Sequence, residues 1–218
     1  FNPALLGRAL LLATFPVAMT SAWLPPLTDG VLFTYLSGGI DAITTATPLA
    51  VMKEQGMAVF RETFGSPATV YPTFFLGLRP GSIGETSGLL ILLGGLYLMY
   101  RRYITWHIPV SVLGSIAVLT WIFGGDTLFS GDPLLAVLTG GAILGAVSMA
   151  TDYVTSPSTR TAQLAYGVGI GALTVLIRLK GGYPEGICYA ILLMNPLSTV
   201  LDGWFKPKRF APPLGGEK

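Results

Sequence analysis

Long runs without a charged side chain constrain this chain more than any other feature. The longer runs are Ala9–Thr28, Tyr103–Gly125, Pro133–Thr151, Thr161–Ile177 and Gly186–Leu201, and a shorter one is Thr86–Tyr100. A helix needs about 20 mostly apolar residues to cross a bilayer. Charged residues make up 11% of the chain, whereas a soluble domain carries about 25%. We therefore predict an all-α integral membrane protein with about six transmembrane helices.

The alternative is a large soluble protein with buried helices, and the glycines argue against it. Glycine recurs inside the apolar runs, as in Gly94-Gly95, Gly140-Gly141 and Gly167-x-Gly169-x-Gly171. Glycine weakens helices that face water, whereas in lipid it permits close contact between helices. We expect the last of these motifs to serve helix packing, because a dinucleotide fingerprint would follow a strand.

Lysine and arginine predict the orientation, because cytoplasmic loops carry an excess of both. Six membrane crossings divide the basic residues into two groups on opposite sides of the bilayer. The larger group contains Arg8, Arg101, Arg102, Arg160, Lys206, Lys208, Arg209 and Lys218, and the smaller group contains Lys53, Arg61, Arg79, Arg178 and Lys180. We expect the larger group to be cytoplasmic. The predicted organisation is a membrane helix at 1–28, an extracytoplasmic segment at 29–86, a five-helix membrane region at 87–205 and a cytoplasmic tail at 206–218.

The segment 41–50 reads Asp-Ala-Ile-Thr-Thr-Ala-Thr-Pro-Leu-Ala and bears most on function. Proline suits the first position of a helix and threonine the cap before it, so Thr47 and Pro48 predict the start of a half-exposed helix over Pro48–Phe64. The same helix terminus would stabilise a phosphate group. Residue chemistry therefore leaves Thr47 as a cap, as a phosphate-linked acceptor, or as both.

This segment resembles a flavin-attachment signature, Asp-x-x-(Ser/Thr)-Gly-Ala-Thr, at which a transferase links FMN to the last threonine. The matching positions are Asp41, Thr44, Thr45, Ala46 and Thr47. With Pro48 following, the segment resembles the D-type component of Rnf complexes, which are membrane ferredoxin:NAD oxidoreductases that couple electron transfer to sodium or proton movement. The B-type component of the sodium-pumping NADH:quinone reductase is the alternative, since it usually lacks the proline. Thr45 stands where the family has glycine, which leaves Thr44 or Thr45 as other acceptors.

Further motifs extend the resemblance over nearly the whole chain. They are Phe1-Asn2-Pro3-Ala4, Gly84-Glu85-Thr86-Ser87, Met149–Asp152 with Thr155-Ser156-Pro157, Gly181–Gly186 and Leu193-Met194-Asn195-Pro196. The resemblance implies a transporter-like half or fragment of a larger inverted-repeat bundle, with an extracytoplasmic flavin-bearing loop. Family members usually have several helices ahead of the first motif. The Asn-Pro pair occurs twice, as Asn2-Pro3 and Asn195-Pro196, which fits a pair of broken helices in such a repeat.

The resemblance also implies a function. It implies a subunit of a translocase-class oxidoreductase, not a stand-alone enzyme, that relays electrons through FMN bound to Thr47 by a phosphoester. A non-covalent riboflavin among the helices, a prokaryotic inner-membrane location, the other Rnf subunits (A, B, C, E and G) as partners and a flavin transferase are implied as well. Two other classes stay open: a solute transporter, and a structural membrane anchor in which Thr47 is only a cap.

Other candidate residues have simpler interpretations. His107, beside Trp106 at a membrane boundary, is interpreted as interfacial, and Cys188 as a small apolar packing group. We expect no catalytic residue, no metal site and no nucleic-acid partner, and the lipid bilayer as surroundings. Four acids border apolar runs, namely Glu85, Asp152, Glu185 and Asp202. They are interpreted as caps or turn residues, with cation binding or proton relay as the alternative. Arg178 and Lys180 are candidates to neutralise a flavin phosphate.

Overall fold

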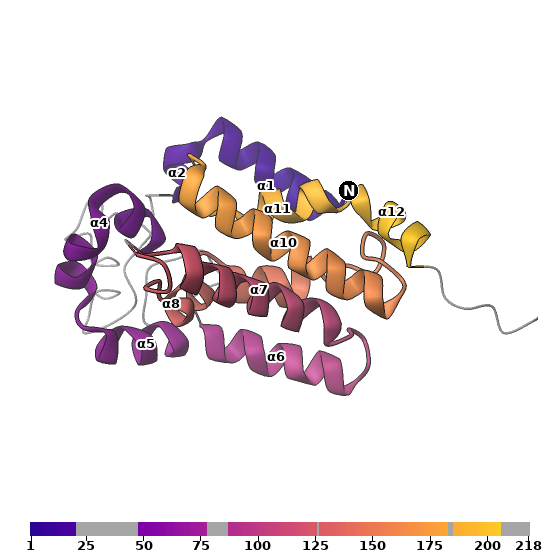
Figure 1. Cartoon of the computed structure of the whole chain (residues 1–218), viewed down its shortest axis with the longest axis horizontal. Helices are drawn as coiled ribbons and strands as arrows, with labels where there is room; N and C mark the ends of the chain where they lie inside the picture. The colour runs from indigo at the N-terminus through magenta and orange to yellow at the C-terminus, as the bar shows by residue number, and fades with distance from the viewer. Residues whose placement is uncertain (21–47, 78–86, 126, 183–184, 206–218) are drawn as a thin grey trace, which may run out of the picture.

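The computed structural model describes residues 1–20, 48–77, 87–125, 127–182 and 185–205. Regular structure in this part of the chain is helical throughout, without a strand. The elements are α1 (Pro3–Thr14), α2 (Pro16–Thr20), α4 (Pro48–Phe64), α5 (Pro67–Leu76), α6 (Gly88–Tyr100), α7 (His107–Phe123), α8 (Pro133–Leu138), α9 (Ala142–Leu144), the π-helical η1 (Gly145–Met149), α10 (Arg160–Lys180), α11 (Ile187–Met194) and α12 (Leu197–Trp204). Figure 1 shows α6, α7 and α10 running along the long axis, with α4 and α5 at one end.

Polar caps and prolines determine where several helices begin. The Asn2 side chain accepts a hydrogen bond from the backbone N–H of Ala4 (3.0 Å), and Asp132 does the same for Leu135 (3.1 Å). Each cap is followed by proline, which suits the first helical position because its missing N–H would have no partner there. Thr159 caps α10. These local signals explain why α1, α8 and α10 begin where they do.

The central contact joins α7 and α10 through small residues. A Cβ atom added to Gly167 would lie 1.8 Å from Ser111 Oγ, and one added to Gly171 would lie 1.8 Å from Ser115 Oγ. Only glycine at these two positions lets the backbones approach this closely. The expected packing role of the Gly167–Gly171 motif is therefore confirmed.

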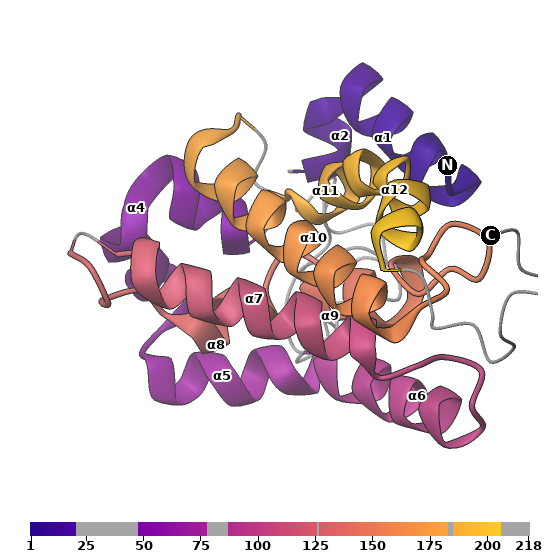
Figure 2. The same ribbon diagram turned by 45° about the vertical axis from the view of Figure 1, so that its right-hand side comes forward.

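Two apolar cores follow from this arrangement. The larger lies around α7, α10 and α11 and includes Ile116, Tyr166 and Ile191, all fully buried. The smaller lies between α4 and α5, where the rings of Phe60 and Phe74 meet edge to face with centroids 6.4 Å apart. Figure 2 shows α8 beside α5, at the end of the molecule where this second core lies. Leu135 of α8 also belongs to this core, so α4 packs beside α5 and the start of α8.

Two of the apolar runs are broken helices. The run from Pro133 contains α8, a break at Gly140 (φ 61°) and Gly141 (φ 62°), and then α9 and η1. Left-handed backbone at two successive residues favours glycine, because only glycine lacks the Cβ that this conformation crowds. The run from Gly186 is split into α11 and α12, which are bent by 54° at Asn195-Pro196.

The predicted set of about six membrane helices is therefore only partly found. Within the described ranges, α10 alone is long and apolar enough to cross a bilayer as one helix. The bent pair α11–α12 would reach that length as a single broken span. Helices α1, α6 and α7 are apolar but have 12, 13 and 17 residues. An uncharged run marks apolar surroundings, but it does not tell a continuous helix from a broken one.

The two Asn-Pro pairs lie side by side. The Asn195 amide oxygen accepts from the backbone N–H of Asn2 (3.2 Å), and its nitrogen lies 2.7 Å from the hydroxyl of buried Tyr166. The start of α1 and the α11–α12 break therefore share one buried polar network centred on α10. The sequence echo corresponds to spatial proximity, whereas the inverted repeat itself stays a prediction.

Arg8, in the middle of α1, forms an ion pair with a residue that follows α10. Its guanidinium pairs with Glu185 (2.7 Å), five residues beyond Lys180 at the end of α10. Arg160 begins α10, about 30 Å away at 1.5 Å per residue. The membrane side of Arg8, like the orientation as a whole, stays a prediction.

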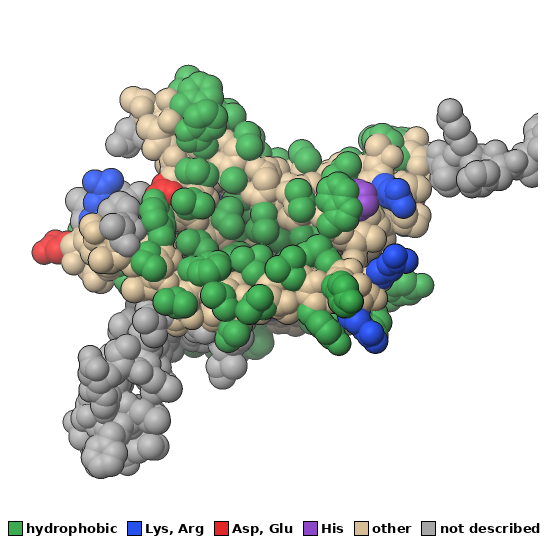
Figure 3. Space-filling view, turned by 90° about the horizontal axis from the view of Figure 1, so that it is seen from below, with side chains coloured by type: hydrophobic (Ala, Val, Ile, Leu, Met, Phe, Trp, Pro, Cys, Tyr) green, Lys and Arg blue, Asp and Glu red, His purple; other side chains and the backbone are tan. Residues whose placement is uncertain are grey.

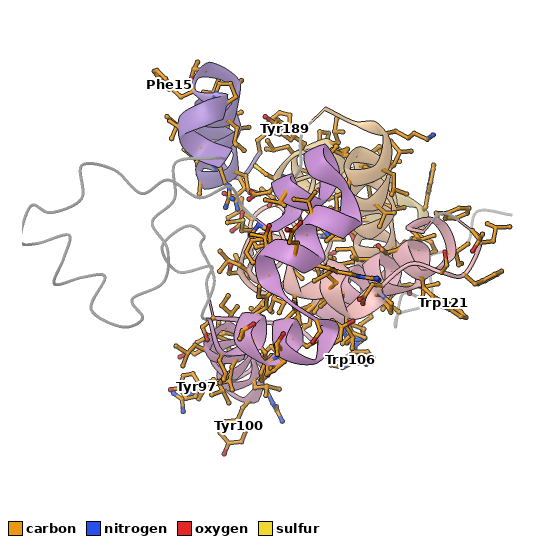
Figure 4. The ribbon with its side chains drawn as sticks, turned by 90° about the vertical axis from the view of Figure 1, so that its left-hand side faces the viewer. Phe15, Tyr97, Tyr100, Trp106, Trp121 and Tyr189 are labelled. Carbon is orange, nitrogen blue, oxygen red and sulfur yellow. The ribbon has the colours of Figure 1, made fainter. Side chains whose placement is uncertain are left out.

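The exterior is largely apolar. In Figure 3 hydrophobic side chains cover the middle of one face, Lys and Arg lie at both ends, and Asp and Glu lie toward one of them. Figure 4 shows Phe15, Tyr97, Tyr100 and Trp121 projecting outward from different sides of the bundle. An outer surface of this composition fits a bilayer or other apolar protein surfaces better than water.

Candidate functional site

The flavin-attachment signature lies almost wholly outside the described residues. Of its positions, Asp41, Thr44, Thr45, Ala46 and Thr47 fall in the segment 21–47. Pro48 is described and buried, and it is the first residue of α4, which ends at Phe64. The predicted helix Pro48–Phe64 is therefore confirmed, with a kink at Gly56 (φ 87°). Capping or modification of Thr47 stays a prediction.

A hollow of about 390 Å³ lies beside the start of α4, between α4, α7, α8 and α10. Its lining combines apolar side chains from α4 with two cations, hydroxyls and one carboxylate: Leu49, Met52, Lys53, Thr120, Thr139, Asp132 and Arg178 are among them. Binding pockets typically measure about 300–1,000 Å³ and are mostly apolar with a few placed polar groups. The hollow has this character.

Arg178 connects the end of α10 to the broken helix. Its Nη1 donates to Ala136 O (2.6 Å), and its Nη2 donates to Thr139 O (3.0 Å) and Gly140 O (3.4 Å). These are carbonyls at the end of α8, where a helix has no further N–H to offer them and its dipole is negative. A Cβ on Gly140 would lie 2.8 Å from Nη2. The glycine break thus makes room for the guanidinium.

Lys53 makes the corresponding contact from α4 to the end of α10. Its Nζ donates to Gly181 O and to Ile177 O (3.5 Å). Partial burial lowers the pKa of Lys53 below its usual 10.5. Two cations therefore line the hollow, each against a helix C-terminus, and the start of α4 adds the positive end of a third helix. The hollow favours an anionic group.

A second hollow of about 520 Å³ lies on the other side of Asp132, lined by Phe60, Arg61, Tyr71 and Asp132 among others. The Tyr71 hydroxyl donates to Asp132 Oδ2, while Oδ1 caps α8. The hydrogen bond to Asp132, followed by burial and the carboxylate charge, raises the pKa of Tyr71 to about 12. Tyr71 therefore stays protonated, and Asp132 joins the α5 helix to both hollows.

The four flagged acids have different positions. Glu85 lies outside the described residues. Asp152 accepts from Thr155 Oγ1 (3.0 Å) in a turn, as predicted. Asp202 accepts from the N–H groups of Ser158 (3.0 Å) and Thr159 (3.3 Å), so it caps the neighbouring helix α10. Glu185 is paired with Arg8 across the bundle.

The packing interpretation of Cys188 is borne out, and the interfacial position of His107 stays a prediction. Cys188 is buried, with its Sγ 3.5 Å from Leu5 O, and packs among apolar side chains. His107 stacks on Trp106 with ring centroids 4.1 Å apart. Within the part of the chain that the structure describes, three or more His, Cys, Asp or Glu side chains do not gather where they would hold a metal ion.

Sequence reasoning finds some of these site residues and misses others. Arg178, a candidate from the sequence, lines the first hollow, whereas Lys180 does not. Lys53 and Tyr71 are not identified by their sequence context, because each acts on a group far away in the chain. The Asp132-Pro133 pair carries a readable signal, since an acid before proline is typical of a helix start.

Comparison with known proteins finds a matching family and several similar proteins. The model of the NQR2, RnfD, RnfE family matches residues 1–211. The D component of the proton-translocating ferredoxin:NAD(+) oxidoreductase complex of Clostridium ljungdahlii is 51% identical over 96% of this chain and 61% of that protein. The D component of the Na(+)-translocating ferredoxin:NAD(+) oxidoreductase complex of Acetobacterium woodii is 43% identical over 95% of this chain and 58% of that protein. The chain thus spans less than two thirds of the length of these relatives.

Proposed function

The chain belongs to the NQR2, RnfD, RnfE family, and we propose on that basis that it is the D-type membrane subunit of an ion-translocating ferredoxin:NAD oxidoreductase of the Rnf type. Its part is to relay electrons through an FMN joined to Thr47 by a phosphoester. The observation that supports this most is the position of α4. That helix begins at Pro48, directly after the signature, and its first turns line a hollow that carries two cations.

The residues around the hollow suit a flavin phosphate and ring. FMN, when bound, supplies one- and two-electron chemistry that side chains lack. A helix leaves the N–H groups of its first turn without intrahelical partners, and these groups together with the dipole of α4 would favour a phosphate at Thr47. Arg178 and Lys53 add positive charge on the facing side. Leu49 and Met52 offer apolar surface to an aromatic ring system.

The described part of the lining contains one carboxylate, Asp132. That carboxylate is engaged as a cap of α8 and as the acceptor of the Tyr71 hydroxyl.

The setting of the subunit follows from the same proposal. We place the α4 end, and with it Thr47, on the extracytoplasmic side, because Arg101 and Arg102 mark the other end as cytoplasmic. The apolar exterior would contact lipid and the sister Rnf subunits. A flavin transferase would load Thr47, and a non-covalent riboflavin would lie among the helices. The inner membrane of a prokaryote is the proposed location.

One rival function has an observation in its favour. Broken helices such as α8–α9 and α11–α12 occur in secondary transporters, where they surround the substrate site. A transporter without a redox role would bind no chromophore and would move a solute into liposomes. A B-type subunit of the quinone reductase differs by usually lacking the proline after the acceptor threonine.

The test is the fluorescence of the full-length protein after denaturing electrophoresis, following co-expression with a flavin transferase. We expect a fluorescent band that survives boiling in detergent, that Thr47→Ala abolishes and that Thr47→Ser retains. Thr45→Ala is the matched control and should leave the band. A band that persists in Thr47→Ala would assign the acceptor to another residue, and its absence from the parent protein would refute the proposal.

A further inference from the structure

One end of the molecule combines arginine with exposed aromatic and leucine side chains. Arg101 and Arg102 follow α6, and Arg160 begins α10. Thr105 Oγ1 donates to Gln163 Oε1 (2.8 Å), which joins the loop after α6 to the first turn of α10. Figure 3 shows Lys and Arg side chains gathered at this end of the apolar face. The three arginines, all exposed, are called the basic rim below.

The charge of the basic rim is not neutralised by nearby acids. In the described ranges, none of the three arginines lies within 4.0 Å of a carboxylate oxygen. The two acids at this end accept hydrogen bonds from other groups, because Asp152 accepts from Thr155 Oγ1 and Asp202 accepts from the backbone N–H of Ser158. An arginine guanidinium forms two parallel hydrogen bonds with a phosphate. The basic rim is therefore suited to an anionic oxygen ligand.

The backbone at Arg102 gives an independent reason to look for a ligand. Arg102 has φ 59°, and the N–H of Tyr103 bonds to Leu98 O (3.0 Å), which together form a helix end that favours glycine. An arginine at such a position is strained relative to glycine, and residues held in this way often serve function. Folding alone would thus favour glycine, which has no side chain, at position 102.

An exposed apolar stripe leads from the basic rim along α6. Leu90, Leu93, Tyr97 and Tyr100 are spaced for one helix face and are 66%, 55%, 59% and 84% exposed. Figure 4 shows the two tyrosines pointing away from the bundle. The stripe extends about 15 Å at 1.5 Å per residue, which is about half the thickness of the hydrocarbon core. That length matches the acyl chains of a single leaflet.

We propose that the basic rim and the α6 stripe together form a binding site for an anionic phospholipid, with its phosphate on the arginines and an acyl chain along Leu90, Leu93 and Tyr97. The exposed tyrosines and Trp106 lie where aromatic side chains meet the headgroup level of a bilayer. Basic clusters next to a membrane helix attract anionic lipids. The site is separate from the flavin hollow, at the opposite end of α10.

The experiment measures the relative association of spin-labelled phosphatidylglycerol and spin-labelled phosphatidylcholine with the full-length protein in bilayers. The parent protein should prefer phosphatidylglycerol, and Arg102→Gly should lower that preference by about fivefold. Because glycine suits the backbone there, this variant should unfold at the same temperature as the parent or higher. Arg102→Lys should keep much of the preference, and Arg61→Gln, at the other end, is the matched control and should leave it unchanged.

Any of four results would overturn the proposal. One is equal association of the two lipids with the parent protein, and another is an unchanged preference in Arg102→Gly combined with Arg101→Gln. The third is loss of sister subunits from these variants with lipid preference intact, which would assign the basic rim to a protein partner. Inorganic phosphate should not displace the bound lipid, and displacement by it would show a phosphate site instead.

Discussion

The close contact between α7 and α10 predicts that one added methyl group destabilises the protein. In Gly171→Ala, the new Cβ would lie 1.8 Å from Ser115 Oγ, 2.8 Å from Ser115 Cβ and 3.0 Å from Val112 O. The Ser115 hydroxyl can rotate away only by losing its hydrogen bonds to Ser111 O (2.7 Å) and Val112 O (3.0 Å). Its Cβ and the backbone carbonyl cannot move without shifting the helix.

The magnitude follows from comparison with a glycine that has space around it. Gly114, on α7, has no atom within 4 Å of an added Cβ. Gly114→Ala should therefore be neutral or stabilising by up to about 1 kcal/mol, as alanine favours helix. Overpacking of a close contact costs about 1–3 kcal/mol. We expect Gly171→Ala to be less stable than Gly114→Ala by about that amount, which is roughly a five- to 150-fold change in the folding equilibrium.

Reversible unfolding of the purified protein in mixed detergent micelles would measure these differences. Ser115→Gly in the Gly171→Ala background should recover much of the loss, and the double-mutant cycle should give a coupling of about 0.5–3 kcal/mol. Equal stability of Gly171→Ala and Gly114→Ala, or a coupling near zero, would show that α7 and α10 are not packed this closely.

Two more perturbations test the groups around the hollows. Arg178→Gln removes the charged donor to the carbonyls of Ala136 and Thr139 and should lower the free energy of unfolding by about 2–4 kcal/mol. The variant should therefore unfold at a lower temperature than the parent protein. An unchanged unfolding temperature would contradict these contacts. Tyr71 has its pKa raised from 10.0 to about 12, so the neutral phenol stabilises the fold below pH 10.0 and that contribution is lost as pH rises toward 12. The difference in tyrosinate absorbance between the parent and Tyr71→Phe should show one late-titrating phenol, and a difference that titrates near pH 10 would refute the Asp132 contact.

The predictable part of the fold is set by local chemistry. Pro48 after threonine predicts the start of α4, and the mixture of apolar and charged residues between Pro48 and Phe64 predicts its half-exposed character. Glycines four apart in α10 predict a close helix contact, which is found with Ser111 and Ser115. In each case the signal lies within a few residues of the feature that it predicts.

What sequence reasoning misses depends on contacts between distant segments. The break at Gly140 is stabilised by Arg178, 38 residues further along the chain. Counting crossings groups Arg8 with Arg160, but it does not reveal the ion pair of Arg8 with Glu185, which follows the other end of α10 in the chain. Uncharged runs suggest whole helices, since hydropathy does not register left-handed glycines or the bend before Pro196. The hollow beside α4 arises only when four helices meet.

The flavin proposal depends on one residue, and peptide mass mapping tests it most directly. Trypsin should release the peptide from Ala9 to Lys53, which contains Thr44, Thr45 and Thr47. After co-expression with the transferase, fragmentation of this peptide should place the mass of FMN less one water on Thr47. A peptide without the added mass, or one that carries it on a different residue, would contradict the account.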